Sequence, residues 1–200
     1  MHPANAFRIE DEARLLAHLD RHPLVTLAAA PEGRPLVAHT PVVARRIEGR
    51  LVLDFHLSRG NALSAALPGG FAAVMVSLGP DAYVSPDWYV AADQVPSWNY
   101  VSVEAEGPVA ALDEAGLVRL LDDLSEREEG RLAPKPVWTR GKMSAGRFET
   151  MLRGIIGGRM EVARFEGTFK LSQNKSAADR AGAVAALGEH PLARLMRDEG

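Results

Sequence analysis

A succession of short apolar runs, separated by tight-turn signals, is the feature that most constrains the fold. Leu24–Ala30 and Leu36–Val43 are two such runs, and the connector Pro31–Arg34 between them contains a proline and a glycine. A third run, Ile47–Leu57, carries the hairpin signal Glu48-Gly49 near its start. Hairpins join antiparallel strands, whereas parallel strands need long crossover connections. The sequence therefore predicts a mainly antiparallel sheet.

Three further segments extend this sheet. We expect a strand over Phe71–Leu78 that Gly79-Pro80 ends, with Asp81–Val84 as a short edge segment. Trp98–Leu112 alternates polar and apolar residues with the period of a strand. Gly157–Leu171 is a long strand or a bent hairpin, with glycines at 158 and 167 where it could bend. Six or so strands with inserted helices predict a mainly β (α+β) fold, a small closed or split β-barrel.

The inserted helices are indicated by apolar stripes and end signals. Asp113–Glu129 is the clearest, because Asp113 is a good N-cap and the leucines that follow it form one stripe. The proline-rich stretch near 131–138 is interpreted as a loop, so the chain is predicted to form one domain with a C-terminal helical tail. The other expected helices are Ile9–His22, Gly60–Leu67, Met143–Ile155, Ser176–Leu187 and His190–Arg197.

Composition excludes several classes of protein. The chain has no cysteine, which removes disulfides, thiolate catalysis and cysteine-ligated metals. Its start lacks the features of a signal peptide, and no stretch approaches the roughly 20 apolar residues that span a bilayer, so a cytoplasmic location is expected. The net charge is -3 and no helix-turn-helix is evident, which argues against tight direct DNA binding. The basic residues between Arg131 and Arg164 are interpreted as a solvated face or an oligomer contact.

Common catalytic motifs are absent. No G-x-G-x-x-G, Walker-type loop or G-x-S-x-G elbow is present. His18 and His22 have the spacing of a zinc pair, but no glutamate follows His18, and two solvated histidines are the better interpretation. What remains are four polar clusters on or just after strands: residues 39–41, 55–61, 83–100 and 169–182. For the last, "FKLSQNKSAADRAG", a helix cap with solvated neighbours and a rim of ligand-binding donors are both open.

The motifs "FHLSRGNAL", "GPDAYVSPDWY", "VPSWNYVSVEAEG", "MLRGIIGG" and "FKLSQNKSAADRAG", in this order, resemble the PaiB family of FMN-binding negative transcriptional regulators. The resemblance runs from Phe7 to about Leu187. The loop between Tyr89 and Pro96 departs from it, because family members often carry a longer lysine-rich insert there.

The resemblance implies a flavin-reductase-like split β-barrel over residues 1–200, usually a homodimer with two FMN sites shared at the interface. It also implies a regulator linked to protease production and sporulation in bacilli. The output would then be a flavin-dependent sensor signal to a protein partner or DNA. The alternative is a flavin-dependent oxidoreductase acting on a small substrate, and a barrel that has lost its cofactor is a third interpretation. A flavin brings its own chemistry, so missing acids or nucleophiles do not separate the first two.

By the same resemblance, His39, Thr40 and Pro41 are assigned to the isoalloxazine ring. Ser58, Arg59 and Asn61 are assigned to the phosphate, with backbone N–H groups near Gly60 assisting them. Arg45 and Arg46 are the next candidates for the phosphate. His56 could serve the ring or the phosphate. The residues expected to complete the site from the other subunit are Trp98, Lys170, Ser172, Gln173 and Asn174.

The geometry of the final strand gives one further expectation. Side chains alternate faces in an extended segment, so Lys170, Ser172 and Asn174 should share one face while Leu171 anchors the other. Gln173 can bend back only if the strand ends there. Either Asn174 or Ser176 is expected to cap the following helix.

Overall fold

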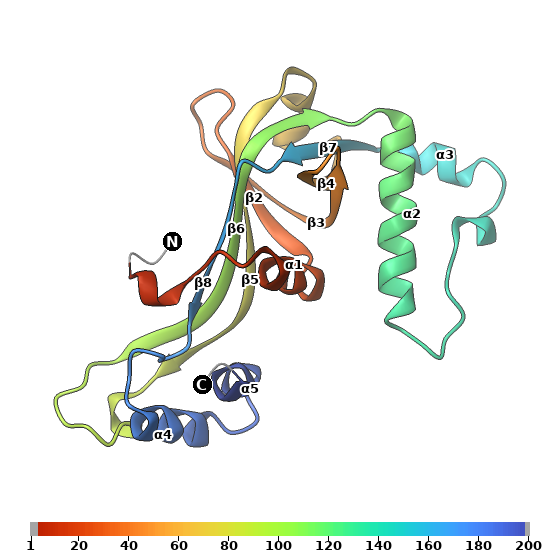
Figure 1. The fold of residues 1–200 in the computed structure, drawn as a ribbon. Helices are drawn as coiled ribbons and strands as arrows, with labels where there is room; N and C mark the ends of the chain where they lie inside the picture. Colours follow the sequence, from red (N-terminus) through yellow and green to blue (C-terminus); the bar gives the residue numbers. More distant parts are fainter. Residues whose placement is uncertain (1–3, 199–200) are drawn as a thin grey trace. The chain divides into compact units, whose positions relative to one another are not determined.

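The computed structural model describes residues 4–198, drawn as a ribbon in Figure 1. The chain forms two compact units. The barrel unit consists of Pro23–Val76 and Ala105–Arg164. The terminal unit consists of the described residues up to His22, Ser77–Glu104, and those from Phe165 onward. The strands are β1 (Arg8–Ile9), β2 (Leu24–Ala29), β3 (Leu36–Ile47), β4 (Arg50–Ser58), β5 (Phe71–Val84), β6 (Ser97–Ala111), β7 (Ile155–Glu161) and β8 (Arg164–Lys170). The α-helices are α1 (Glu12–Arg21), α2 (Glu114–Gly130), α3 (Arg147–Leu152), α4 (Ala177–Leu187) and α5 (Pro191–Asp198).

A closed barrel of antiparallel strands forms the barrel unit. The strand order is β6-β5-β2-β3-β4-β7, and a further β6–β7 pairing closes the ring. Leu27 pairs with Ala38 across β2 and β3, and Val43 pairs with Asp54 across β3 and β4. The predicted antiparallel barrel is therefore confirmed, including the hairpin at Glu48-Gly49.

The barrel interior is filled by side chains of the strands. Phe55 on β4 is fully buried, and it pairs with Gly158 on β7. A Cβ atom at position 158 would lie 2.4 Å from Cζ of Phe55, so this glycine makes room for the ring rather than a bend. Other fully buried barrel residues are Leu27, Leu53, Met75 and Met160.

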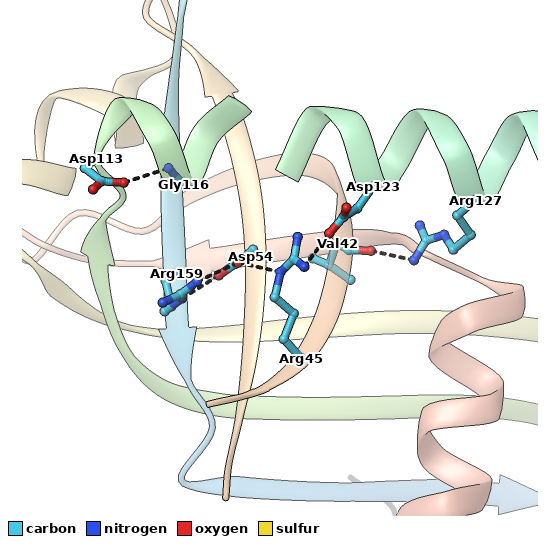
Figure 2. Close-up of polar contacts among 8 residues, drawn as sticks. All are labelled: Val42, Arg45, Asp54, Asp113, Gly116, Asp123, Arg127 and Arg159. Carbon is cyan, nitrogen blue, oxygen red and sulfur yellow. Dashed lines mark hydrogen bonds and ion pairs between the residues drawn. The ribbon is translucent and has the colours of Figure 1, made fainter. Parts of the chain in front are cut away.

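Helix α2 covers part of the barrel unit through one apolar stripe. Its N-cap Asp113 accepts a hydrogen bond from the Gly116 N–H at 2.6 Å, as the sequence predicts. Three leucines of the stripe pack against Val43 of β3, namely Leu117, Leu120 and Leu124. Arg127 Nη1 donates to the carbonyl of Val42 at 3.1 Å, which ties the helix to the same strand (Figure 2).

The terminal unit has a separate apolar core. Leu15 of α1, Val101 of β6, Phe169 of β8 and Met196 of α5 belong to one buried cluster. Strand β1 pairs antiparallel with β8, where Ile9 lies opposite Gly167. Within residues 4–198, no helix is long and apolar enough to cross a bilayer.

The prediction that Gly79-Pro80 ends a strand is wrong, because β5 continues to Val84. Within the described residues β2 pairs with Ala73–Val76 of β5, and the rest of β5 lies beyond that pairing. Proline lacks an N–H and is tolerated where one strand edge has no partner. Gly79 has a different role: a Cβ there would lie 2.7 Å from Cε1 of His18.

Three other predicted segments differ from the structure. The helix expected over Met143–Ile155 is limited to α3, because Gly146 adopts φ 73° before it and β7 begins at Ile155. The segment Gly157–Leu171 is divided into β7 and β8 at Val162 and Ala163. The N–H groups of these two residues donate to the carbonyls of Leu51 and Glu106. The insert expected at Gly60–Leu67 consists of two short 3-10 turns, Ala62–Ala65 and Leu67–Gly69.

Candidate flavin site

The three residues assigned to the ring lie on β3 with alternating exposure. Thr40 is buried, and its hydroxyl donates to the carbonyl of His56 at 2.7 Å. His39 is exposed, with Nδ1 3.2 Å from Oγ1 of Thr26 on β2. Pro41 is half-buried. Thr40 thus joins β3 to β4, whereas His39 presents its ring at the surface.

His56 contains a buried polar atom without a partner. The side chain as a whole is half-buried, and its Nδ1 atom is buried without a hydrogen-bond partner among residues 4–198. Burial lowers the pKa of His56, so the ring is neutral at pH 7. A neutral imidazole nitrogen can donate or accept according to its tautomer. His56 is therefore suited to a polar group of a bound ligand.

The turn after β4 uses most of its backbone donors internally. The Gly60 N–H donates to Oγ of Ser58 at 3.3 Å, and the Asn61 N–H donates to the carbonyl of Ser58 at 2.9 Å. Oδ1 of Asn61 accepts from the Leu63 N–H at 2.9 Å. The expectation that the N–H groups near Gly60 are available to a phosphate is therefore wrong at Gly60 and Asn61. The side chains of Ser58, Arg59 and Asn61 are then the main candidate donors of this turn.

Arg59 is oriented by the chain before β7. Its backbone N–H donates to the Gly154 carbonyl at 2.9 Å, and its Nε donates to the Arg153 carbonyl at 3.0 Å. The terminal nitrogens Nη1 and Nη2 make no hydrogen bond or ion pair with the part of the chain that the structure describes. A cavity of about 300 Å³ lies beside Arg59 and is lined by Arg153, Glu149 and Asp113 among others. The guanidinium is held in place and retains donors for an anion.

Arg45 and Arg46, the alternative phosphate residues, are both engaged. Arg45 Nε binds Oδ2 of Asp54 at 3.0 Å, and Arg45 Nη1 forms an ion pair with Asp123 (Figure 2). Arg46 Nη1 donates to the Gly49 carbonyl at 2.7 Å. Among these three arginines, Arg59 thus offers the most available guanidinium.

Sequence reasoning missed the buried ion cluster around Asp54. The Asp54 side chain is 2% exposed, and Arg159 of β7 reaches it with Nε at 2.6 Å and Nη2 at 2.8 Å (Figure 2). The hydrogen bonds to Asp54 raise the pKa of Arg159 above its usual value. An aspartate inside the apolar run "LVLDFHL" was the available signal, because a buried carboxylate needs a charged partner.

The residues assigned to the second half of the site lie in the terminal unit. Lys170 Nζ donates to Oγ of Ser97 at 2.6 Å. Ser172 is buried at φ 61°, and its hydroxyl accepts from Nδ2 of Asn99 at 2.8 Å. Trp98 is 52% exposed and donates from Nε1 to Asp81 at 2.8 Å.

Gln173 bends back on its own strand. Its Oε1 accepts from the Leu171 N–H at 2.7 Å, and its Nε2 donates to the Phe169 carbonyl at 2.6 Å. Strand β8 ends at Lys170, so the expected alternation of Lys170, Ser172 and Asn174 on one face is wrong. Asn174 is exposed, and the helix cap is Ser176, whose Oγ accepts from the Asp179 N–H at 3.1 Å.

The residues after Gln173 hold the loop 85–96. Asp179 Oδ1 accepts from the N–H groups of Val90 at 2.8 Å and Ala91 at 2.9 Å. Hydrogen bonds, first that from the Ala91 N–H, lower the pKa of Asp179. Lys175 Nζ donates to Oε1 of Gln94 at 2.6 Å, and a Cβ at Gly182 would lie 2.1 Å from the Trp88 carbonyl oxygen. The part of the polar motif from Lys175 to Gly182 therefore holds this loop in place.

The structure therefore brings together two groups of predicted residues, one in each unit. His39, Thr40, Pro41, His56, Ser58, Arg59 and Asn61 lie on β3, β4 and the turn after it. Trp98 and residues 170–174 lie in the terminal unit. No group of three metal-binding side chains is present in residues 4–198.

Comparison with known proteins identifies related sequences and folds. Residues 1–164 match the family described as "Putative FMN-binding domain". The chain is 25% identical over 194 residues to "Protease synthase and sporulation protein PAI 2" of Bacillus subtilis (strain 168), covering 96% of this chain and 92% of that protein.

Two solved structures share the fold. The FAD and heme binding protein from Mycobacterium smegmatis is 22% identical with a TM-score of 0.60, covering 92% of this chain and 81% of that one. The flavocytochrome Anf3 from Azotobacter vinelandii is 20% identical with a TM-score of 0.57, covering 84% of this chain and 72% of that one.

Proposed function

Because the chain belongs to this family of FMN-binding domains, we propose that it is a PaiB-type flavoprotein whose bound FMN serves a regulatory or sensing role. The PaiB resemblance and the barrel fold predicted from the sequence are confirmed by the family match and the fold neighbours. The regulatory role is supported by the name of the relative PAI 2, which refers to protease synthesis and sporulation.

The observation that carries the proposal is the set of side-chain donors after β4. Arg59 is oriented through Nε and keeps two terminal nitrogens, and the Ser58 hydroxyl and the Asn61 amide nitrogen lie in the same short turn. An arginine fork beside hydroxyl and amide donors fits a phosphate monoester. In this proposal Ser58, Arg59 and Asn61 hold the FMN phosphate.

The ring of the flavin is assigned to His39, Thr40, Pro41 and His56. Thr40 fixes the backbone of His56, and the unpartnered Nδ1 of His56 would gain a hydrogen bond from a heterocyclic ligand. When bound, the flavin supplies the electron-transfer chemistry. The residues of the chain bind and orient it.

A homodimer with shared flavin sites is part of the proposal. The terminal unit exposes large apolar side chains, which are Leu78, Tyr83, Val90, Val95 and Trp98. Such side chains favour burial against a second copy. We assign Trp98, Lys170, Ser172, Gln173 and Asn174 to the flavin of the other subunit. Ser172 and Gln173 would act through the backbone turn they stabilise, because their polar atoms already have partners.

FMN is expected to bind more tightly than FAD, because the turn offers one compact phosphate site and the chain has no dinucleotide fingerprint. The absorption spectrum of protein purified without added cofactor should show a flavin, and fluorescence titration should rank FMN ahead of FAD. Equal or tighter binding of FAD would contradict this expectation. Multiple turnovers with a nicotinamide reductant and a small acceptor would favour the oxidoreductase alternative.

Arg59→Ala is expected to weaken FMN binding by about 1.5–3 kcal/mol, the range for a charge-assisted hydrogen bond to an anion. Isothermal titration of folded variant and parent measures the difference. Arg34→Ala is the matched control, since Arg34 is an exposed arginine of the turn between β2 and β3. A change well below 1 kcal/mol for Arg59→Ala would place the phosphate elsewhere.

A mixed dimer tests whether the sites are shared. One subunit carries Arg59→Ala and the other carries Lys170→Ala with Asn174→Ala. Shared sites leave one intact site and one site that has lost both clusters, so the mixed dimer should bind one FMN with the parent affinity. Two equally impaired sites would mean that both clusters serve the same subunit.

A further inference from the structure

A second cavity lies wholly within the terminal unit. It has a volume of about 500 Å³ and lies between α1, α5 and the strand residues Pro80, Val101 and Phe169. This volume is within the range of about 300–1,000 Å³ that small-molecule sites occupy. None of the residues assigned to the flavin lines it.

The sequences of both helices direct one face toward this cavity. On α1 the lining residues are Arg14, Ala17, His18 and Arg21, and on α5 they are Pro191, Arg194, Leu195 and Asp198. Each set has the spacing i, i+3, i+4, i+7, which places its members on one face of a helix. The buried residues Leu192, Ala193 and Met196 occupy a different face of α5. The lining face of α5 therefore differs from the face that these residues bury, although Leu195 lines the cavity and also packs against the core.

Cations outnumber acids around the cavity. Arg14, Arg21 and Arg194 line it, against the single carboxylate of Asp198. Arg21 has no hydrogen bond or ion pair within residues 4–198. Arg194 pairs with Glu189 at 3.2 Å, but both side chains are largely exposed, and such surface pairs are weak. An incoming anion would therefore meet little competition at Arg21 and Arg194.

Apolar and aromatic side chains form part of the cavity lining. The Arg14 guanidinium lies 5.1 Å from the centroid of the Phe169 ring, and the rings of His18 and His22 are 4.7 Å apart. Burial lowers the pKa of both histidines, and the positive charge of Arg21 adds to this at each of them. The histidines therefore add polar but uncharged surface at pH 7, and the positive charge comes from the arginines.

We propose that this cavity binds a small amphiphilic anion, a carboxylate carried on an aliphatic or aromatic body. The carboxylate would contact Arg21 and Arg194, and the apolar body would contact Val101, Phe169 and Leu195. A cationic rim over apolar walls is complementary to both parts of such a molecule. The site is distinct from the flavin site and would let a metabolite of this class influence the protein.

Competition in the parent protein is the first test. 1-Anilinonaphthalene-8-sulfonate is the fluorescent probe, and octanoate and 1-octanol are matched competitors that differ in charge. Octanoate should displace the probe at concentrations about tenfold lower than 1-octanol, the ratio expected for one charge-assisted contact. FMN should not displace it. Equal displacement by 1-octanol, or competitive displacement by FMN, would overturn the proposal.

Substitutions in the cavity lining test whether the fluorescent probe binds there. Arg21→Gln with Arg194→Gln should weaken probe binding by at least about tenfold, the same equivalent of one charge-assisted contact. Ala17→Leu should weaken it by filling the cavity without a change of charge. Arg197→Gln is the control, because Arg197 is exposed on α5 and does not line the cavity. Unchanged affinity in both test variants, or an equal loss in the control, would contradict the assignment.

Discussion

Replacing Asp54 by asparagine is expected to lower the free energy of unfolding by about 3 kcal/mol, the low end for breaking a buried ion cluster. The neutral amide would leave Arg45 and Arg159 without their shared carboxylate. Both arginine side chains are about three-quarters buried, with exposed fractions of 26% and 28%. Nη2 of Arg45 is already buried without a partner, so the site has no reserve acceptor among the described residues. Urea denaturation of variant and parent measures the loss.

Asp123→Asn is the matched control. Asp123 pairs with the same Arg45, but its side chain is 40% exposed. An exposed pair contributes at most about 1 kcal/mol. If both substitutions cost the same, burial of the Asp54 carboxylate is not the source of the effect.

Acidification from pH 6.5 to pH 4 is expected to remove on the order of 3 kcal/mol of unfolding free energy through His18. Burial, followed by the charge of His22, lowers the pKa of His18 from 6.5 to about 4. In this window the unfolded chain binds the proton and the folded protein does not. Stability therefore rises with pH across the window and is lost as the pH falls through it.

Comparison with His18→Gln isolates this contribution from the carboxylates that titrate near pH 4. The His18 Nε2 atom lies 3.3 Å from the Ser77 carbonyl oxygen, and a carbonyl only accepts, so Nε2 carries the proton. A glutamine amide can replace that donor but does not titrate. The difference in unfolding free energy between variant and parent should change with pH. A constant difference between pH 4 and pH 6.5 would contradict the assignment.

Much of the fold was predictable because local signals and tertiary structure agree. Asp113 caps α2 as its position suggests, and Glu48-Gly49 forms the turn between β3 and β4. The errors arise where local signals have a second use. The sequence suggests that Gly79 ends a strand, but in the structure this glycine makes room for the His18 ring. The sequence likewise suggests a bend at Gly158, but this glycine makes room for the Phe55 ring. Such close approaches depend on residues far away in the sequence.

The candidate site was less predictable, because the hydrogen-bond partner of each side chain depends on the three-dimensional fold. Arg45, Arg46 and Arg59 look alike in sequence, yet Arg45 and Arg46 are engaged by Asp54 and Gly49. Ser172 and Gln173 suggested ligand donors but satisfy Asn99 and the backbone of β8. Residue type and order identified the family, whereas the availability of each donor required the structure.

The attachment of the loop 85–96 to α4 has a consequence for how this family can vary in length. Asp179 of α4 fixes Val90 and Ala91, and Lys175, which lies just before the N-cap Ser176, fixes Gln94. The chain between these anchors is therefore held at both ends. Exposed segments between fixed anchors tolerate insertions, because no buried contact depends on their length. Residues gained or lost between Ala91 and Gln94 would therefore change the surface of the protein while the loop anchors and the core of the terminal unit stay the same.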